Sequence, residues 1–314
     1  MLLCRRLVVA FLLALALTPV AQASTTPQSN TTIKTILIIS HADEFDGRLP
    51  ATLYYTDDPR YLVSSWNYCF QPMRGWGLYF DLKTEEGWTD ERFTSYLDLF
   101  KQRGFGNLLY VDVTECDQRY SQRWADSIIE AGPQGGLDLM SLNPEGSWYR
   151  YLRDGMVELT RRFGGSISGF AIDRLDRCPS AQESVWAAML LDDVRASSAV
   201  PGLVYAINSL QDAEHQGFLA ARAEFVGSDG VPVSELGDWV ERYEGLASLA
   251  SVKEPYIVPR LDDADPEASE AGYRMVLARG GFTFFDDRPL YLGMMERILA
   301  DCPPIKARSG VSSF

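Results

Sequence analysis

The sequence predicts an α/β fold, a single (β/α)8 TIM barrel with an extra N-terminal strand and a long N-terminal segment. Its 314 residues are 46% hydrophobic and 23% charged, which are globular values, and the chain is long enough to bury a large core. Short β-rich runs alternate with helical stretches. Several runs are apolar on both faces, as expected of parallel strands covered by helices. This alternation favours one closed barrel.

Eight runs are predicted to form the barrel strands, with helices between them. Apolar residues within Phe93–Phe100 recur at the spacing i, i+3, i+4, i+7 of an amphipathic helix. Ser180 and Glu183 have the spacing of a capping box at a helix start. The eight predicted strands are Gly77–Leu82, Asn107–Val113, Leu137–Leu142, Ser168–Leu175, Gly202–Asn208, Ala223–Ser228, Pro255–Leu261 and Phe282–Asp287.

A ninth β-rich run stands near the N-terminus, one more than the barrel needs. We interpret Ile33–Ser40 as the extra strand before the barrel. The following segment, Asp43–Arg74, would then cross one end of the barrel with no clear structure of its own. A stretch of that length without secondary structure is uncommon in a compact domain.

The first residues have the pattern of a cleavable export signal. Arg5 and Arg6 precede the apolar run Leu7–Leu17, and Ala21-Gln22-Ala23 is a small-x-small cleavage pattern. The run is shorter than the ~20 residues that cross a bilayer. We therefore expect cleavage after Ala23 and a secreted or periplasmic protein without stable membrane insertion. The predicted boundaries are 1–23 for the signal peptide, 24–35 for a flexible leader, 36–306 for the barrel and 307–314 for a C-terminal tail.

Charge and cysteine content narrow the partners further. The net charge of −14 argues against nucleic acid, which is bound by basic surfaces. An oxidising compartment permits disulfides, and three pairings of the four remaining cysteines are open. These are Cys69, Cys116, Cys178 and Cys302. The sequence leaves the oligomeric state open.

The missing motifs exclude several kinds of chemistry. Only two histidines, His41 and His215, are present, which makes a histidine-ligated zinc site or a Ser-His-Asp triad improbable. Neither a Walker A loop nor a G-x-G-x-x-G motif occurs, so a nucleotide cofactor has no support. We expect no cofactor and no metal. Abundant carboxylates and aromatic residues are what glycoside hydrolysis uses, with one carboxylic acid and one carboxylate at the scissile bond.

Asp173 is the strongest catalytic candidate because it ends an otherwise apolar strand. If its face points to the barrel axis, Asp173 stands at the rim of the core, where active sites of this fold lie. The alternative is an ion pair with Arg174 or Arg177. Glu224 enters the predicted sixth strand, where an unpaired charge is costly. It is about equally well explained as an exposed residue ending the preceding helix.

Further polar residues gather at predicted strand ends, where they could contact a sugar. Glu115 could instead form an ion pair with Arg119, and Asn208 could be a turn residue. Aspartates in Asp286-Asp287 could be helix caps or lie in solvated loops. The predicted substrate-binding set is Asp81, Asp112, Glu115, Arg174, Asp176, Asn208, Arg260 and Asp286.

The order of these motifs resembles the family 114 glycoside hydrolases, the endo-α-1,4-polygalactosaminidases. Tyr110–Glu115 is similar to the family's Tyr-led strand that ends in Glu, and Ser168–Asp176 to its Asp-rich fourth strand. Asn208 stands where the family's fifth strand ends in Gln-Asn, and Glu224 stands on the sixth strand. Gly280–Phe282 is similar to its final Gly-rich strand.

The resemblance implies that Asp173 and Glu224 are the catalytic pair, with Asp173 as nucleophile or stabiliser and Glu224 as general acid/base. It also implies an α-linked, galactosamine-type polysaccharide as substrate. The chain departs from the family pattern at Thr114, Ala171 and Arg260. Similar fourth-strand aspartates occur in α-galactosidase-like barrels, so a different α-glycosidase is a related interpretation.

Two other functions are compatible with the same residues. A barrel that binds polysaccharide without cleaving it would use the aromatic and polar rim but no tuned acid. A carboxylate-bound divalent-cation enzyme would use Asp81, Asp112 and Asp286. The separation of the Asp173 and Glu224 carboxyls in a structure distinguishes a glycosidase from a barrel that only binds polysaccharide.

Overall fold

The computed structural model describes a set of residues that all lie in one compact unit, Thr32–Phe314. The other unit, Met1–Thr31, lies outside them, so the signal peptide, leader and tail stay predictions. Within the described ranges no helix is long and apolar enough to cross a membrane. The described residues are 37–40, 62–65, 90–102, 106–208, 219–239, 241, 254–259, 265–278, 284–286, 294 and 297.

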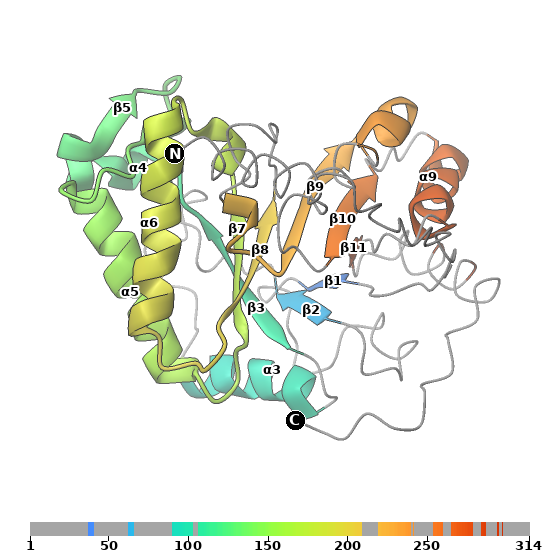
Figure 1. Ribbon diagram of the computed structural model, residues 1–314, viewed down its shortest axis with the longest axis horizontal. Coiled ribbons are helices and arrows are strands. Elements are labelled where there is room, and N and C mark those ends of the chain that lie inside the picture. Colours follow the sequence, from blue (N-terminus) through green and yellow to red (C-terminus); the bar gives the residue numbers. More distant parts are fainter. Residues whose placement is uncertain are drawn as a thin grey trace, which may run out of the picture. The chain divides into compact units, whose positions relative to one another are not determined.

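An eight-stranded sheet, parallel throughout, is the centre of the fold (Figure 1). Its order is β10-β9-β8-β7-β3-β2-β1-β11, so the last strand lies beside the first. A pairing of β10 with β11 is not among those of the described strands. The strands are β1 Leu37–Ser40, β2 Leu62–Ser65, β3 Asn107–Asp112, β7 Gly169–Asp173, β8 Val204–Asn208, β9 Phe225–Val231, β10 Glu254–Pro259 and β11 Phe284–Asp286. The predicted α/β class with a parallel sheet is confirmed.

Three strand assignments differ from the prediction. The run Ile33–Ser40 contains β1, which pairs with β2 and β11 inside the sheet, so its place before the barrel was wrong. The segment Asp43–Arg74, predicted to be unstructured, contains β2.

Leu137–Leu142 contains β6 (Leu137–Met140), which belongs to a separate antiparallel sheet. Burial in β6 alternates residue by residue, as in a strand with one covered face, whereas β3 is buried throughout. The predicted strand Gly77–Leu82 lies outside the described residues.

The second sheet has three antiparallel strands and lies between β3 and α5 in the chain. Its strands are β4 (Glu115–Asp117), β5 (Ile128–Glu130) and β6, in the order β4-β6-β5. Asp138 in β6 accepts hydrogen bonds from the Gln118 side chain and the Gly132 N–H, both at 2.9 Å. Its carboxylate thereby fastens the two connecting segments, α4 (Gln118–Ser121) with η4 (Gln122–Ser127) and the β5–β6 turn, to the sheet.

Helices cover one face of the parallel sheet. They are α3 Asp90–Gln102, α5 Ser147–Phe163, α6 Ala181–Ser197 and α9 Pro266–Ala278, with short 3-10 turns η5 Leu175–Arg177 and η6 Val233–Glu235. Figure 1 shows α5 and α6 side by side along β3, β7 and β8. The predicted helix over Phe93–Phe100 and the cap at Ser180, which accepts a hydrogen bond from Glu183 N–H at 3.2 Å, are confirmed.

Alternation along the strands separates two apolar clusters. Phe170, Ile172 and Tyr205 belong to the large core that includes the buried residues of α5 and α6. Leu108, Ala171 and Ala206 form a second cluster with Val204. Because successive side chains of a strand point to opposite faces, the second cluster marks the face turned away from these helices.

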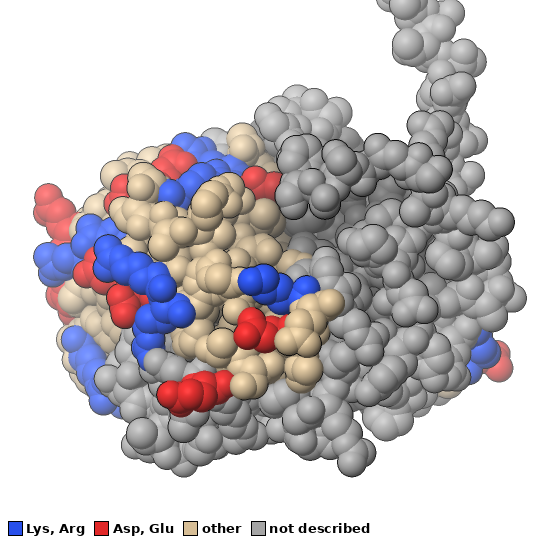
Figure 2. All heavy atoms as spheres, turned by 90° about the horizontal axis from the view of Figure 1, so that it is seen from below, with Lys and Arg blue, Asp and Glu red and all other residues tan. Residues whose placement is uncertain are grey.

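Charges on the described surface are mixed. On the face shown in Figure 2, Lys and Arg side chains lie interspersed with Asp and Glu side chains among the described residues. On this face the acidic excess of the whole chain is not gathered into a single patch.

Candidate functional site

The site lies where β3 and β7 end, on the sheet face turned away from α5 and α6. Tyr110 and Asp112 in β3 are register partners of Ala171 and Asp173 in β7. Alternation places all four side chains on the same face as Leu108. The carboxyl ends of parallel strands are where active sites of α/β barrels form.

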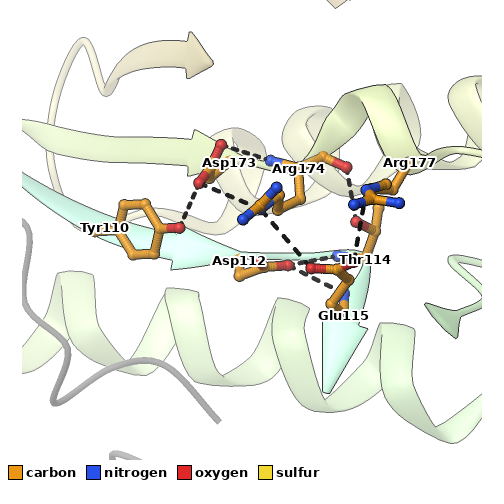
Figure 3. Close-up of polar contacts among 7 residues, drawn as sticks. All are labelled: Tyr110, Asp112, Thr114, Glu115, Asp173, Arg174 and Arg177. Carbon is orange, nitrogen blue, oxygen red and sulfur yellow. Dashed lines mark hydrogen bonds and ion pairs between the residues drawn. The ribbon is translucent and has the colours of Figure 1, made fainter. Parts of the chain in front are cut away.

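Asp173 is the central carboxylate of the site and is only 5% exposed. Its Oδ1 accepts a hydrogen bond from the Arg174 N–H at 2.8 Å. Its Oδ2 accepts a hydrogen bond from the Tyr110 hydroxyl and lies 3.9 Å from Arg174 Nε. Figure 3 shows the phenol and the guanidinium approaching this carboxylate from two sides. Two hydrogen-bond donors and one guanidinium group at ion-pair distance thus fix the position of this carboxylate.

The Tyr110 phenol remains a proton donor to Asp173. Burial raises its pKa well above the ordinary value, and the negative charge of Asp173 raises it further. A phenol in this setting does not ionise at neutral pH, so it orients Asp173 without adding a second negative charge.

Asp112 is fully buried beside Asp173. Its Oδ1 accepts hydrogen bonds from the N–H groups of Thr114, at 3.1 Å, and Glu115, at 3.0 Å. Its Oδ2 is buried and has no hydrogen-bond partner among the described residues. Burial raises the pKa of Asp112 well above its ordinary value, and the charges of Asp173 and Glu115 raise it further. Both causes disfavour the ionised form.

Arg174 joins the carboxylates through a left-handed backbone conformation. Its φ is 64°, the only positive φ at a non-glycine among the described residues. This turn leads the side chain back over the site, with Nε 3.7 Å from Glu115 Oε2 (Figure 3). The Thr114 hydroxyl fixes the turn by donating to the Arg174 carbonyl oxygen at 2.7 Å. Backbone strain of about 1–3 kcal/mol that is retained in this way is typical of functional sites.

Carboxyl groups outnumber guanidinium groups around Asp173. Arg177 lies with its Nε 3.6 Å from Glu115 Oε1, which gives the site two guanidinium groups. Asp176 in η5 adds a fourth carboxyl, whose pKa is raised by burial and then by the charge of Asp173. An acidic group of this kind favours a cation or a transition state that develops positive charge. Within the described ranges, no group of three or more His, Cys, Asp or Glu residues is arranged to hold a metal ion.

Glu224 is not part of this constellation. It precedes β9 at the amino end of the sheet, where its Oε2 accepts a hydrogen bond from Tyr205 N–H at 2.8 Å. The same oxygen lies 3.6 Å from Arg195 Nη2 on helix α6. Register places Gly227, three positions after Glu224, at the level of Asp173. The two acids are thus roughly 10 Å apart along the strands and on opposite faces of the sheet. Asp173 and Glu224 are therefore not neighbours in this structure, and the catalytic roles predicted for them stay predictions.

The other predicted site residues divide into two groups. Asp112, Glu115, Arg174 and Asp176 are brought together around Asp173. Asn208 ends β8 and Asp286 ends β11, both at the carboxyl edge of the sheet. The last two, Asp81 and Arg260, lie outside the described residues, so their binding roles stay predictions, as does the three-aspartate cation site.

Tyr110 and Thr114 are site residues that the sequence analysis did not single out for a role. A signal for Tyr110 exists in the sequence, because it precedes Asp112 by two positions and therefore shares its face. Thr114 contacts a backbone carbonyl 60 positions later, and no local pattern indicates such a contact.

Both described cysteines have free thiols. Cys116 is buried and Cys178 is half-buried, and neither forms a disulfide. Burial raises the pKa of Cys178 to about 12, which keeps this thiol protonated and unreactive. The expected disulfides involving Cys116 or Cys178 are therefore absent, and Cys69 and Cys302 lie outside the described residues.

Comparisons with known proteins point to one kind of fold. No protein-family model matches the chain, and no curated protein matches it. Solved structures do match. The glycoside hydrolase domain of PelA from Pseudomonas aeruginosa is 14% identical, with a TM-score of 0.52 over 82% of this chain and 96% of that one.

Two further solved structures agree with this match. Ega3 of Aspergillus fumigatus, in complex with galactosamine, is 7% identical, with a TM-score of 0.52 over 83% of this chain and 93% of that one. A β-1,4-mannanase of glycoside hydrolase family 113 is 10% identical, with a TM-score of 0.52 over 82% of this chain and 89% of that one. The chain has the fold of glycoside hydrolase barrel domains. At these identities the likeness concerns the fold alone.

Proposed function

We propose that this protein is an exported glycoside hydrolase with a closed (β/α)8 barrel that cleaves an α-linked, amino-sugar polysaccharide. The single observation that carries the proposal is Asp173, a carboxylate held by two hydrogen bonds and an ion pair at the carboxyl end of the fourth strand of the sheet. The fold likeness to the PelA glycoside hydrolase domain and to galactosamine-bound Ega3 supports it. So does the resemblance to the family 114 enzymes.

Asp173 would act on the positive charge that develops at the sugar during cleavage. Glycoside hydrolysis passes through an oxocarbenium-like transition state, and a fixed carboxylate either attacks it or stabilises it. Because Tyr110 and Arg174 already orient Asp173, little reorganisation is needed at the moment of reaction. The carboxyl groups nearby also offer hydrogen-bond acceptors to a substrate that carries an ammonium group.

We assign the general-acid role to Asp176 rather than to Glu224. A general acid must hold its proton at working pH, and the pKa of Asp176 is raised by burial and by the charge of Asp173. Glu224 instead contacts Arg195 and the Tyr205 N–H, away from Asp173. Activity should fall on the alkaline side as Asp176 ionises. Asp176→Asn should lower kcat by about 10²–10⁴-fold, and a pH–rate profile that is unchanged in this variant would contradict the assignment.

The direct test is release of reducing ends from a partly deacetylated α-1,4-galactosamine polymer by the purified chain. Wild type should release them, and Asp173→Asn should not. Glu224→Gln is the matched control, because it neutralises an acid of the same sheet on the other face. Loss of activity in Glu224→Gln with retention in Asp173→Asn would overturn the proposal.

A barrel that binds polysaccharide without cleaving it is the second candidate. The observation that favours it is the separation of Glu224 from Asp173, since the acid partner suggested by the family pattern is absent from the site. Retention of the polymer in affinity electrophoresis, without release of reducing ends at any pH, would support this candidate.

Export is proposed on the N-terminal pattern. Expression of the full chain with recovery of a secreted or periplasmic form that begins at Ser24 would support cleavage after Ala23. Recovery of the intact N-terminus from the cytoplasm would contradict it.

A further inference from the structure

The buried carboxyl of Asp112 has features that the proposed mechanism does not use. Asp112 is 0% exposed, and its Oδ2 has no hydrogen-bond partner among the described residues. An ionised carboxylate left in this way destabilises the folded state, because the oxygen has lost water and gained no donor. The protein must therefore hold this group in a form other than a free carboxylate.

Asp112 and Asp173 are direct neighbours across two parallel strands. They are register partners, so their Cα atoms are about 4.8 Å apart and their side chains lie on one face. Two carboxyls at this spacing do not both ionise readily, because the second negative charge would face the first in a water-poor site. One proton is therefore retained by the pair.

The donors around the two acids differ and decide which one holds the proton. Asp173 accepts from the Tyr110 hydroxyl and the Arg174 N–H, and it lies beside the Arg174 guanidinium. Asp112 accepts only two backbone N–H groups, both on Oδ1. Hydrogen bonds to the charged form favour ionisation, so the negative charge belongs on Asp173 and the proton on Asp112.

We propose that Asp112 and Asp173 form an acidic pair that carries one proton at neutral pH, with Asp112 as the protonated, positioning member. The proton on Asp112 leaves Asp173 as the one anion facing a substrate cation, and it prevents repulsion between the two strand ends. The proposal deepens the proposed function, on which it rests only for its consequence in catalysis. The other titratable or charged groups around the pair in the described structure are Tyr110, Glu115, Cys116, Arg174, Asp176 and Arg177.

The test is a pH titration of the full chain labelled with carbon-13 at aspartate carboxyls, followed by NMR. The resonance missing in Asp112→Asn identifies Asp112. In wild type it should keep the chemical shift of a protonated carboxyl at pH 7. In Asp173→Asn, where the neighbouring charge is removed, its midpoint should move to lower pH. An Asp112 resonance with the shift of an ionised carboxylate at pH 7 would overturn the proposal.

Stability gives a second readout that needs no assignment. A folded-state pKa raised above the unfolded value means that the unfolded chain loses its proton first as pH rises from about 4. Wild type should therefore lose stability relative to Asp112→Asn between pH 4 and pH 8, which is measured as a growing difference in Tm. A Tm difference that does not change with pH would overturn the proposal. If Asp112→Asn does not fold, the Asp112 carboxyl is assigned through its backbone correlations in uniformly carbon-13 and nitrogen-15 labelled wild type. The midpoint shift of that resonance in Asp173→Asn, read against wild type, then decides.

These outcomes separate the acidic pair from the proposed function. If the chain cleaves no polysaccharide but Asp112 is protonated at pH 7, the acidic pair is supported and the proposed hydrolase function is contradicted. If the chain is an active hydrolase but Asp112 is ionised at pH 7, the hydrolase function is supported and the acidic pair is contradicted.

Discussion

Two regions of the sheet each combine a carboxylate, an arginine and a tyrosine but differ in what surrounds them. At the carboxyl end, Asp173 is contacted by Arg174 and Tyr110. At the amino end, Glu224 is contacted by Arg195 and lies at the level of Tyr205. The first group faces away from helices α5 and α6, whereas Tyr205 donates from its hydroxyl to the Leu191 carbonyl oxygen of α6 at 2.8 Å.

The two regions differ in the ratio of carboxyl to guanidinium groups and in how completely their polar atoms are hydrogen-bonded. Arg195 and Glu224 neutralise each other, and Arg195 also donates to the Arg222 carbonyl oxygen at 2.6 Å and lies over the Tyr205 ring. The Asp173 region has more carboxyls than guanidinium groups and a buried oxygen with no hydrogen-bond partner among the described residues. A saturated ion pair stabilises the fold, whereas an unbalanced, preorganised one is suited to a charged ligand.

The largest expected difference between the regions is in turnover. Asp173→Asn should lower kcat on a galactosamine polymer on the order of 10³-fold, because the charge facing the transition state is removed. Glu224→Gln should leave kcat within about threefold and lower the free energy of unfolding by about 1 kcal/mol. Reducing-end assays and urea unfolding measure the two quantities. Similar losses of kcat in both variants would abolish the distinction.

The second-largest difference is expected between Arg174 and Arg195, whose replacement should affect turnover and stability respectively. Arg174→Gln should lower kcat about 10²-fold, because Asp173 and Glu115 lose their shared cation. Arg195→Gln should instead lower stability by about 1–2 kcal/mol, since it breaks a cation contact and two hydrogen bonds to carbonyl oxygens. Steady-state kinetics and thermal unfolding of both variants give the answer. An Arg195→Gln variant that loses activity while keeping its Tm would contradict the expectation.

The smallest contrast concerns the tyrosine hydroxyls. Tyr110→Phe removes one hydrogen bond to a charged group and should lower kcat about tenfold. Tyr205→Phe removes a buried hydrogen bond to a helix carbonyl and should cost about 1 kcal/mol of stability with kcat unchanged. The kcat values and Tm values of this matched pair are compared under identical conditions. Equal kcat values for the two variants would place Tyr110 outside the site.

The residues of the Asp173 region that lie within or directly after one strand could be predicted from strand periodicity. The apolar strand Gly169–Asp173 with an acid at its end could be recognised from composition, and its neighbours in the chain, Arg174 and Asp176, followed. Glu224 could not be placed in this way, because a shift of one residue at the start of β9 moves a side chain to the other face. The sequence therefore left open on which face of the sheet the Glu224 side chain lies.

The short N-terminal strands show a second reason for failure. A run such as Leu62–Ser65 is too brief to stand out from a loop in the sequence, and it forms a strand only because β1 and β3 supply its hydrogen bonds. Leu137–Met140 was predicted as a barrel strand but pairs antiparallel with β4, which suits a strand that is buried on alternate residues. Pairing partners distant in sequence decide both cases.

Local periodicity and the point where an apolar run stops were enough to predict the α/β class, the main helices and the carboxylate at the end of the fourth strand of the sheet. Which acids become neighbours depends on how the strands pair. Asp112 and Asp173 are 61 positions apart and become neighbours only through the parallel pairing of β3 with β7. The raised pKa of Asp112 follows from that burial and proximity, which no stretch of sequence contains.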